Sequence, residues 1–192
     1  PGSPAPVIAL TVPEGMSEGA AQAWLEQALP QARFGPNHVY HIYPAAEAAR
    51  TVTAATSRAP CHGAGCLAKS LLDWKPSLSS CARGVKIGVI DTSFDMSHPA
   101  LKGRSYDMKD FRASPMAATS DWHGTAVLSV LAGDGGSAAP GLVPDAHFLL
   151  AATFGAGTDG QASADAVSVL AALSWLDGKA DTINMSFSGP RN

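Results

Sequence analysis

The sequence predicts an α/β protein built on a three-layer parallel sheet with helices on both faces, preceded by a small α+β segment. Two observations lead to this prediction. From Val85 onward, apolar and β-branched runs alternate with helical patterns, as in sheets whose two faces are both covered. Before that point, residues 6–44 show one helical pattern between two strand-like runs, and residues 45–60 show little periodicity.

The first unit is expected to be a β-α-β arrangement. Residues 7–12 form an apolar run closed by a proline, which predicts a strand. Ser17 has the side chain of a helix N-cap, and the apolar positions that follow keep helical spacing up to residue 29. Residues 38–43 alternate polar and apolar side chains, which predicts the second strand.

The larger unit is expected to alternate strands and helices. A buried strand at 85–90 is followed by a helix at 124–132, a strand at 148–154, an amphipathic helix at 163–176 and a strand at 182–186. Parallel strands need such crossover connections, so the pattern favours a parallel sheet.

We therefore divide the chain into a β-α-β segment (1–44), a linker with a cysteine-bearing segment (45–82) and the larger α/β unit (83–192). The net charge of −3 gives no reason to expect nucleic acid as a partner. No apolar run reaches the roughly 20 residues needed to span a bilayer, so no membrane span is expected in this chain.

Three cysteines, Cys61, Cys66 and Cys81, lie close together in the sequence. Structural zinc sites need four ligands at other spacings, and only His62 lies nearby, so no metal is expected. A disulfide with one thiol left over would suit a secreted enzyme, and three reduced thiols are the alternative. No cofactor is expected either.

Two residues stand out as candidates for catalysis. Asp91 ends a predicted strand, and catalytic groups in open α/β sheets lie at the carboxyl ends of strands. His123 opens a predicted helix about thirty residues later. A carboxylate at a strand end can orient an imidazole, which then serves as a general base. The simpler alternatives are a turn cap at Asp91 and an ordinary surface histidine at the helix start.

A third segment completes the pattern. The runs Asp-Thr-Ser at 91–93, His-Gly-Thr at 123–125 and Asn-Met-Ser-Phe-Ser-Gly at 184–189 resemble, in this order, three motifs of the subtilisin-like serine peptidases (subtilases). The resemblance covers about residues 83–190 and implies an incomplete subtilisin-like fold. It implies that Asp91 and His123 belong to an Asp-His-Ser triad. It also implies that the strand near residue 186 pairs with bound peptide by β-addition through four substrate-binding residues, Ser186, Phe187, Ser188 and Gly189.

The chain departs from the family pattern at three positions. Ser93 and Ser188 stand where the family usually has glycine, and Ala126 stands where it usually has a second histidine. The added hydroxymethyl group at Ser188 is expected to narrow the mouth of the substrate pocket. The glycine-rich run at 155–160 does not fit a dinucleotide fingerprint, and the resemblance makes it a loop beside the substrate cleft.

The resemblance implies a serine endopeptidase that hydrolyses peptide bonds. The family's oxyanion Asn and its Gly-Thr-Ser nucleophile motif would lie beyond Asn192, so the 192-residue chain is expected to be inactive alone. The alternative is a non-catalytic peptide-binding subtilase relative. Residues 6–44 look like part of the family's propeptide, which implies a zymogen.

The same resemblance implies partners and a cellular location for the protein. The expected partners are a peptide or protein substrate and the remaining C-terminal part of the catalytic domain. The expected location is outside the cell or in the cell envelope.

Overall fold

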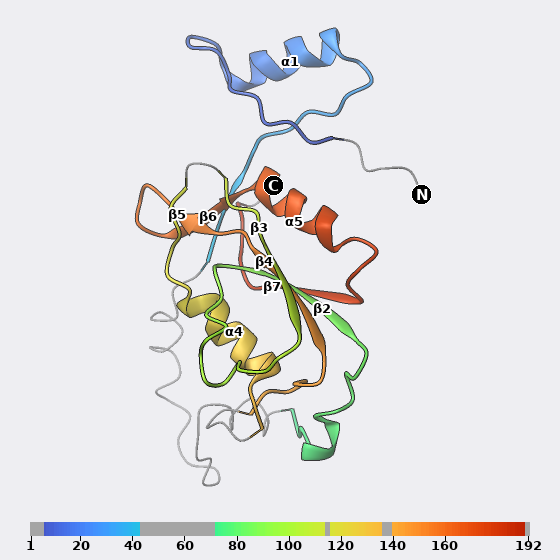
Figure 1. The fold of residues 1–192 in the computed structure, drawn as a ribbon. Coiled ribbons are helices and arrows are strands. Elements are labelled where there is room, and N and C mark those ends of the chain that lie inside the picture. Colours follow the sequence, from blue (N-terminus) through green and yellow to red (C-terminus); the bar gives the residue numbers. More distant parts are fainter. Residues whose placement is uncertain (1–5, 43–71, 114–115, 136–139, 191–192) are drawn as a thin grey trace.

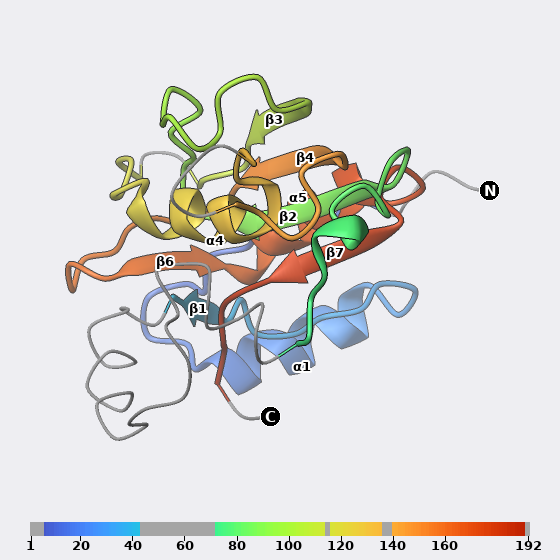
Figure 2. The same cartoon turned by 90° about the horizontal axis from the view of Figure 1, so that it is seen from below.

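The computed structural model describes residues 6–42, 72–113, 116–135 and 140–190. Its centre is a parallel sheet with the strand order β3-β4-β2-β7 (Figures 1 and 2). These strands are β2 (Lys86–Asp91), β3 (Tyr106–Asp110), β4 (His147–Ala152) and β7 (Thr182–Met185). The predicted parallel sheet is therefore confirmed, and β2 lies inside it with a neighbour on each side.

The two faces of the sheet are covered by different helices. Alternate residues of β2 and β4 point to opposite faces, as the period of a strand requires. Val89 and Phe148 pack with Leu128 of α4 (Trp122–Ala132) in one core cluster. Ile90 packs with Leu176 of α5 (Ala166–Leu176) in a second cluster. The fold is thus the three-layer α/β arrangement that the sequence predicts.

A second, smaller sheet is antiparallel and joins distant parts of the chain. It has the order β1-β6-β5, with β1 (Val39–His41), β5 (Gly155–Ala156) and β6 (Ala162–Asp165). The glycine-rich run at 155–160 contains β5 and most of the turn that leads to β6, and Gly160 takes a φ of 79° in this turn, a conformation that glycine adopts without strain.

The N-terminal segment is organised differently from the expectation. Helix α1 (Glu18–Ala28) forms as predicted, and the Ser17 hydroxyl accepts a hydrogen bond from the amide of Ala20 at 3.2 Å. Residues 7–12 do not form the predicted strand, because no other strand of the described part of the chain lies beside them. Their apolar side chains stay exposed, with Ile8 at 73%.

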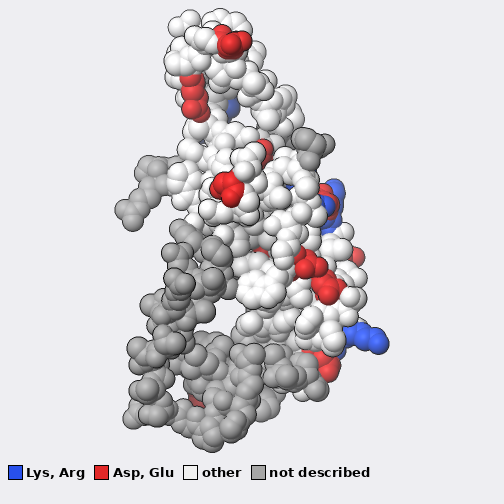
Figure 3. All heavy atoms as spheres, turned by 90° about the vertical axis from the view of Figure 1, so that its left-hand side faces the viewer, with Lys and Arg blue, Asp and Glu red and all other residues white. Residues whose placement is uncertain are grey.

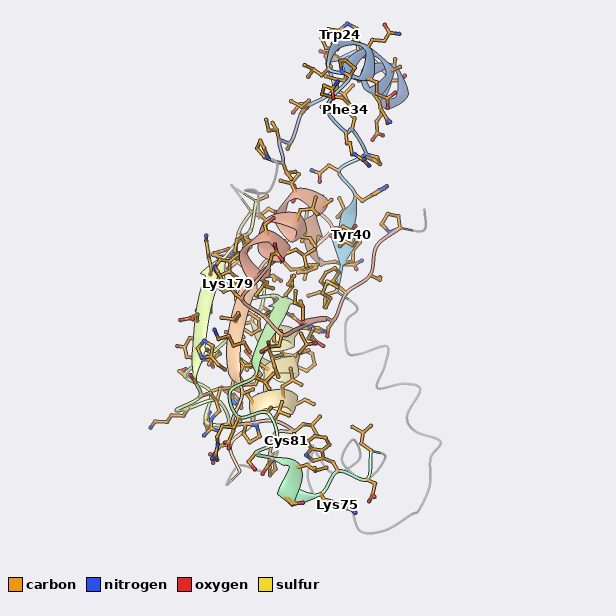
Figure 4. The ribbon with its side chains drawn as sticks, turned by 90° about the vertical axis from the view of Figure 1, so that its right-hand side faces the viewer. Trp24, Phe34, Tyr40, Lys75, Cys81 and Lys179 are labelled. Carbon is orange, nitrogen blue, oxygen red and sulfur yellow. The ribbon has the colours of Figure 1, made fainter. Side chains whose placement is uncertain are left out.

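A β-α-β unit is therefore not formed, since β1 pairs with β6 of the larger unit instead. Helix α1 lies away from the body of the molecule, with Trp24 and Phe34 far from Tyr40 of β1 (Figure 4). On the face that Figure 3 shows, this segment is mostly uncharged, with a few acidic side chains. The division of the chain at residues 44 and 82 stays a prediction.

Two further elements differ from the expectation. Residues 163–165, which the sequence assigned to a helix, belong to β6, because Asp165 caps α5 by accepting from the amide of Ser168 at 2.8 Å. Strand β3 was not predicted, because the alternation of Tyr106 and Met108 with polar residues is too short to stand out, and all of its residues are exposed.

The linker at 45–60 and two of the cysteines, Cys61 and Cys66, lie outside the described residues. Cys81 follows a short 3-10 helix (Pro76–Leu78) and carries a free, exposed thiol. Within the described ranges, no helix has the length and apolar character needed to cross a membrane.

Candidate active site

Asp91 lies at the carboxyl end of β2, at the edge of the sheet where the sequence places it. Its side chain is fully buried, at 0% exposure. The carboxylate oxygen Oδ1 accepts a hydrogen bond from the amide of Thr92 at 2.7 Å. The other oxygen, Oδ2, is buried and has no hydrogen-bond partner among the described residues. This is a costly position for a carboxylate, and such positions are common at functional sites.

His123 contacts Asp91 directly. It is the second residue of α4, and its Nδ1 lies 2.8 Å from Oδ1 of Asp91. A carboxylate only accepts hydrogen bonds, so Nδ1 is the donor and carries the proton. The ring then presents the lone pair of Nε2, which is the atom that a general base uses. The imidazole is 20% exposed, so it can be reached from outside.

Burial raises the pKa of the Asp91 carboxyl above its ordinary value of 3.8. The hydrogen bond from His123 and the one from the Thr92 amide lower this pKa, but they offset only part of the effect of burial. The unsatisfied carboxylate is therefore well suited to stabilise a positive charge that forms on the neighbouring imidazole.

Residues 186–189 follow β7 directly. Since Ile90 of β2 is level with Met185 of β7, this segment begins at the same edge of the sheet as Asp91. The backbone of Ser188 pairs with that of His41: the His41 amide donates to the Ser188 carbonyl at 2.9 Å, and the Ser188 amide donates back at 3.1 Å. One edge of β1 is thus paired with β6 and the other with Ser188.

Aromatic side chains surround this pairing. The ring of Phe187 packs edge-on against Tyr40, with centroids 5.7 Å apart, and lies 4.9 Å from the ring of Phe154. A Cβ atom on Gly189 would lie 2.5 Å from the Tyr40 ring, so only a glycine leaves room for that side chain. The candidate substrate-binding residues therefore already hold an extended segment of this chain.

The same N-terminal segment also caps a helix of the larger unit. The side-chain amide of Asn37 donates to Asp165 at 3.1 Å, and its oxygen accepts from the amide of Val167 at 3.2 Å. The carbonyl of His38 accepts from the amide of Ala166 at 2.8 Å. The sequence did not predict this contact, because the alternation at 38–43 indicates a strand without identifying its neighbour.

A second group of hydrogen-bonded Ser, His and Asp side chains lies away from Asp91. His147 Nδ1 is 2.8 Å from the Ser105 hydroxyl, and its Nε2 is 3.1 Å from Asp107. His147 begins β4, so this group lies at the amino end of the sheet, opposite Asp91. The Asp107 side chain is 70% exposed. The pair of His147 and Asp107 therefore lacks the low-dielectric surroundings of the pair of His123 and Asp91.

The described residues contain no group of three or more side chains that could hold a metal ion. The arrangement around Asp91 offers an oriented imidazole, and the same edge of the sheet carries a segment that pairs with an extended part of this chain.

The match to one protein family agrees with the three sequence motifs. A family model described as the subtilase family matches residues 82–192. Among solved structures, the protease domain of PatA, in a serine-to-alanine mutant, is similar at 18% identity and a TM-score of 0.48, covering 58% of this chain and 40% of that chain. The patellamide maturation protease PatA is similar at 20% identity and a TM-score of 0.43, covering 57% of this chain and 38% of that chain.

The chain thus spans about two fifths of the length of these two structures. No curated protein sequence matches it.

Proposed function

This chain belongs to the subtilase family, and we propose that it is part of a serine endopeptidase that hydrolyses peptide bonds. Asp91 orients the imidazole of His123, and His123 is the general base. A serine outside the three motifs found here attacks the peptide carbonyl. His123 takes the proton from the serine hydroxyl at Nε2 and passes it to the leaving amine.

The observation that carries this proposal is the 2.8 Å contact between Nδ1 of His123 and Oδ1 of Asp91. The two residues are 32 positions apart in the sequence, and they come from a strand end and a helix start. A contact through Nδ1 leaves Nε2 for the substrate side, which is the tautomer that general-base catalysis needs. Burial of the carboxylate adds the electrostatic support described above.

The pairing of β1 with Ser188 supports the assignment of residues 186–189 to peptide binding. An extended segment already adds to this backbone as an antiparallel strand, through two hydrogen bonds. Peptide substrates that bind by β-addition use the same main-chain bonds, with side chains in alternate pockets providing specificity. Phe187 and Gly189 form the walls against which one such side chain, that of Tyr40, is packed.

The same pairing supports an inhibitory role for the N-terminal segment. As long as β1 occupies Ser188, a substrate cannot pair there, so we propose that residues 37–42 keep the site closed in the way of a propeptide. Activation then requires that this segment leaves. The contacts that must break include the two hydrogen bonds of Asn37 at the start of α5.

A peptide-binding protein without catalysis is the second candidate. The pairing at Ser188 favours it equally, because β-addition needs no nucleophile. The two candidates differ in what His123 does: it is essential for the peptidase and dispensable for the binder.

The test uses the protein expressed from its complete reading frame, with release of a dye from unstructured peptides as the measurement. In the peptidase, His123→Ala and Asp91→Asn are expected to lower kcat by at least roughly 10⁴-fold, as removal of triad residues does. The 192 residues present here supply two members of the triad, so we expect no turnover from them alone.

His147→Ala is the matched control, since His147 also bonds to an Asp but lies at the opposite end of the sheet. It is expected to change kcat by less than about threefold, in keeping with a role outside the reaction. Turnover that survives His123→Ala would overturn the peptidase mechanism. Peptide binding without any turnover in the unmodified protein would favour the binder.

A further inference from the structure

Each of the two catalytic motifs contains a threonine that the proposed reaction does not use. Thr92 follows Asp91, and Thr125 follows His123 by two positions. The Thr92 hydroxyl accepts a hydrogen bond from the amide of Gly124 at 2.9 Å. In the other direction, the Thr125 hydroxyl accepts from the amide of Asp95 at 2.8 Å. The threonines therefore link the loop after β2 to the start of α4 twice.

Thr92 takes the place of a helix cap. The N-cap position of α4 is Asp121, whose side chain makes no capping bond and whose backbone is helical, with φ −79° and ψ 0°. A capping side chain normally accepts from the amide two or three positions into the helix. Gly124 is three positions after Asp121, and its amide is satisfied by Thr92 of another element.

The contact is close and oriented. The Thr92 hydroxyl donates to the Ser93 carbonyl at 3.2 Å, which turns its lone pairs toward Gly124. A Cβ atom on Gly124 would lie 2.6 Å from the Ser93 carbonyl oxygen and 3.0 Å from the Thr92 hydroxyl. The helix start can thus reach this distance only because Gly124 has no side chain.

We propose that Thr92 is a positioning residue for the pair of Asp91 and His123. Its amide donates to Oδ1 of Asp91 at 2.7 Å, and its hydroxyl holds the residue that follows His123. One residue, 1% exposed, therefore sets the place of the carboxylate and of the helix that carries the imidazole. This inference rests on the proposed function for its catalytic meaning, and its geometry can be tested without peptide cleavage.

A buried threonine that only stabilises the fold would give a different result. Thr153 is the matched control, because it is also fully buried and near Asp91, while its hydroxyl donates to the Ala151 carbonyl at 3.2 Å and does not contact α4. Loss of this hydroxyl removes a buried hydrogen bond without touching the link between strand and helix.

The experiment measures two signals by NMR in the 192-residue chain: the Nδ1 proton of His123 and hydrogen exchange of the Gly124 amide. In the unmodified chain, we expect Asp91 to protect the Nδ1 proton, which should then give a sharp resonance. In Thr92→Val this resonance is expected to broaden or vanish, and the Gly124 amide is expected to exchange roughly tenfold faster, as for the loss of one buried hydrogen bond. Thr92→Ser and Thr153→Val should keep both signals.

An unchanged Nδ1 resonance in Thr92→Val, or its loss in Thr153→Val as well, would overturn the positioning role. Loss of both signals in Thr92→Ser would also overturn it, because the methyl group and not the hydroxyl would then matter. Thr92→Ala repeats the measurement if the Val variant does not fold.

Asp91→Asn separates this inference from the proposed function. It must abolish the sharp Nδ1 resonance, and survival of that resonance would show that the pair itself is wrong. If the resonance responds to Thr92 as expected and the complete protein shows no peptidase activity, the positioning role stands and only the proposed reaction fails.

Discussion

At the scale of single residues, the site depends on a carboxylate in an unfavourable place. Asp91 is fully buried, one of its oxygens is unpaired among the described residues, and its pKa is raised by burial. The folded chain therefore holds a proton on this group more tightly than the unfolded chain. As the pH rises from the ordinary pKa of 3.8 to the raised pKa of Asp91, the free energy of unfolding falls. Above the raised pKa it falls no further on account of this group.

Asp91→Asn removes this titration. We expect the free energy of unfolding of the variant, minus that of the unmodified chain, to be larger at pH 7 than at pH 3, measured by urea unfolding at both values. Asp110→Asn is the control. For this variant the same difference in the free energy of unfolding should be smaller at pH 7 than at pH 3, because the hydrogen bond from Arg112 lowers the pKa of Asp110. A difference for Asp91→Asn that does not change with pH would refute the raised pKa.

At the scale of elements, β1 joins the N-terminal segment to the larger unit. It pairs with β6 along one edge and with Ser188 along the other, and Tyr40 fills the space over Gly189. The sequence indicated a strand here from its alternation. Its partners lie more than one hundred residues away, and a local pattern carries no information about them.

Gly189→Ala tests this docking. The added methyl group would meet the Tyr40 ring at 2.5 Å, and the ring has Phe187 beside it, so it cannot move aside freely. We expect a cost of about 1–3 kcal/mol in the docking of β1. The measurement is faster hydrogen exchange of the His41 amide, which donates to the Ser188 carbonyl.

Gly35→Ala is the matched change in the same segment, because a Cβ atom there would meet nothing within 4 Å. It should leave exchange of the His41 amide unaltered. Equal exchange in the two variants would contradict the packing of Tyr40 on Gly189.

At the scale of the whole molecule, residues 45–60 remain the predicted linker between the N-terminal segment and the larger unit. We expect limited proteolysis to cut first within 45–60, where the sequence has least periodicity. The cut pieces should stay together on gel filtration, because β1 and Asn37 hold the N-terminal piece through hydrogen bonds that the cut leaves intact. Mass spectrometry locates the cuts, and first cuts inside α1 or β1 would refute this boundary.

Sequence alone was enough to predict the parallel sheet, the strand that ends at Asp91, the helix that carries His123 and the family to which the motifs belong. These features have local signals: apolar runs with a fixed period, and side chains at a strand end or a helix start. Four features are visible only in the folded molecule: the exposed strand β3, the absence of a strand at 7–12, the pairing of β1 with Ser188 and the cap that Thr92 provides for α4. Each of these depends on whether another part of the chain supplies a backbone or hydroxyl partner, and such a hydrogen bond leaves no periodic trace in the sequence.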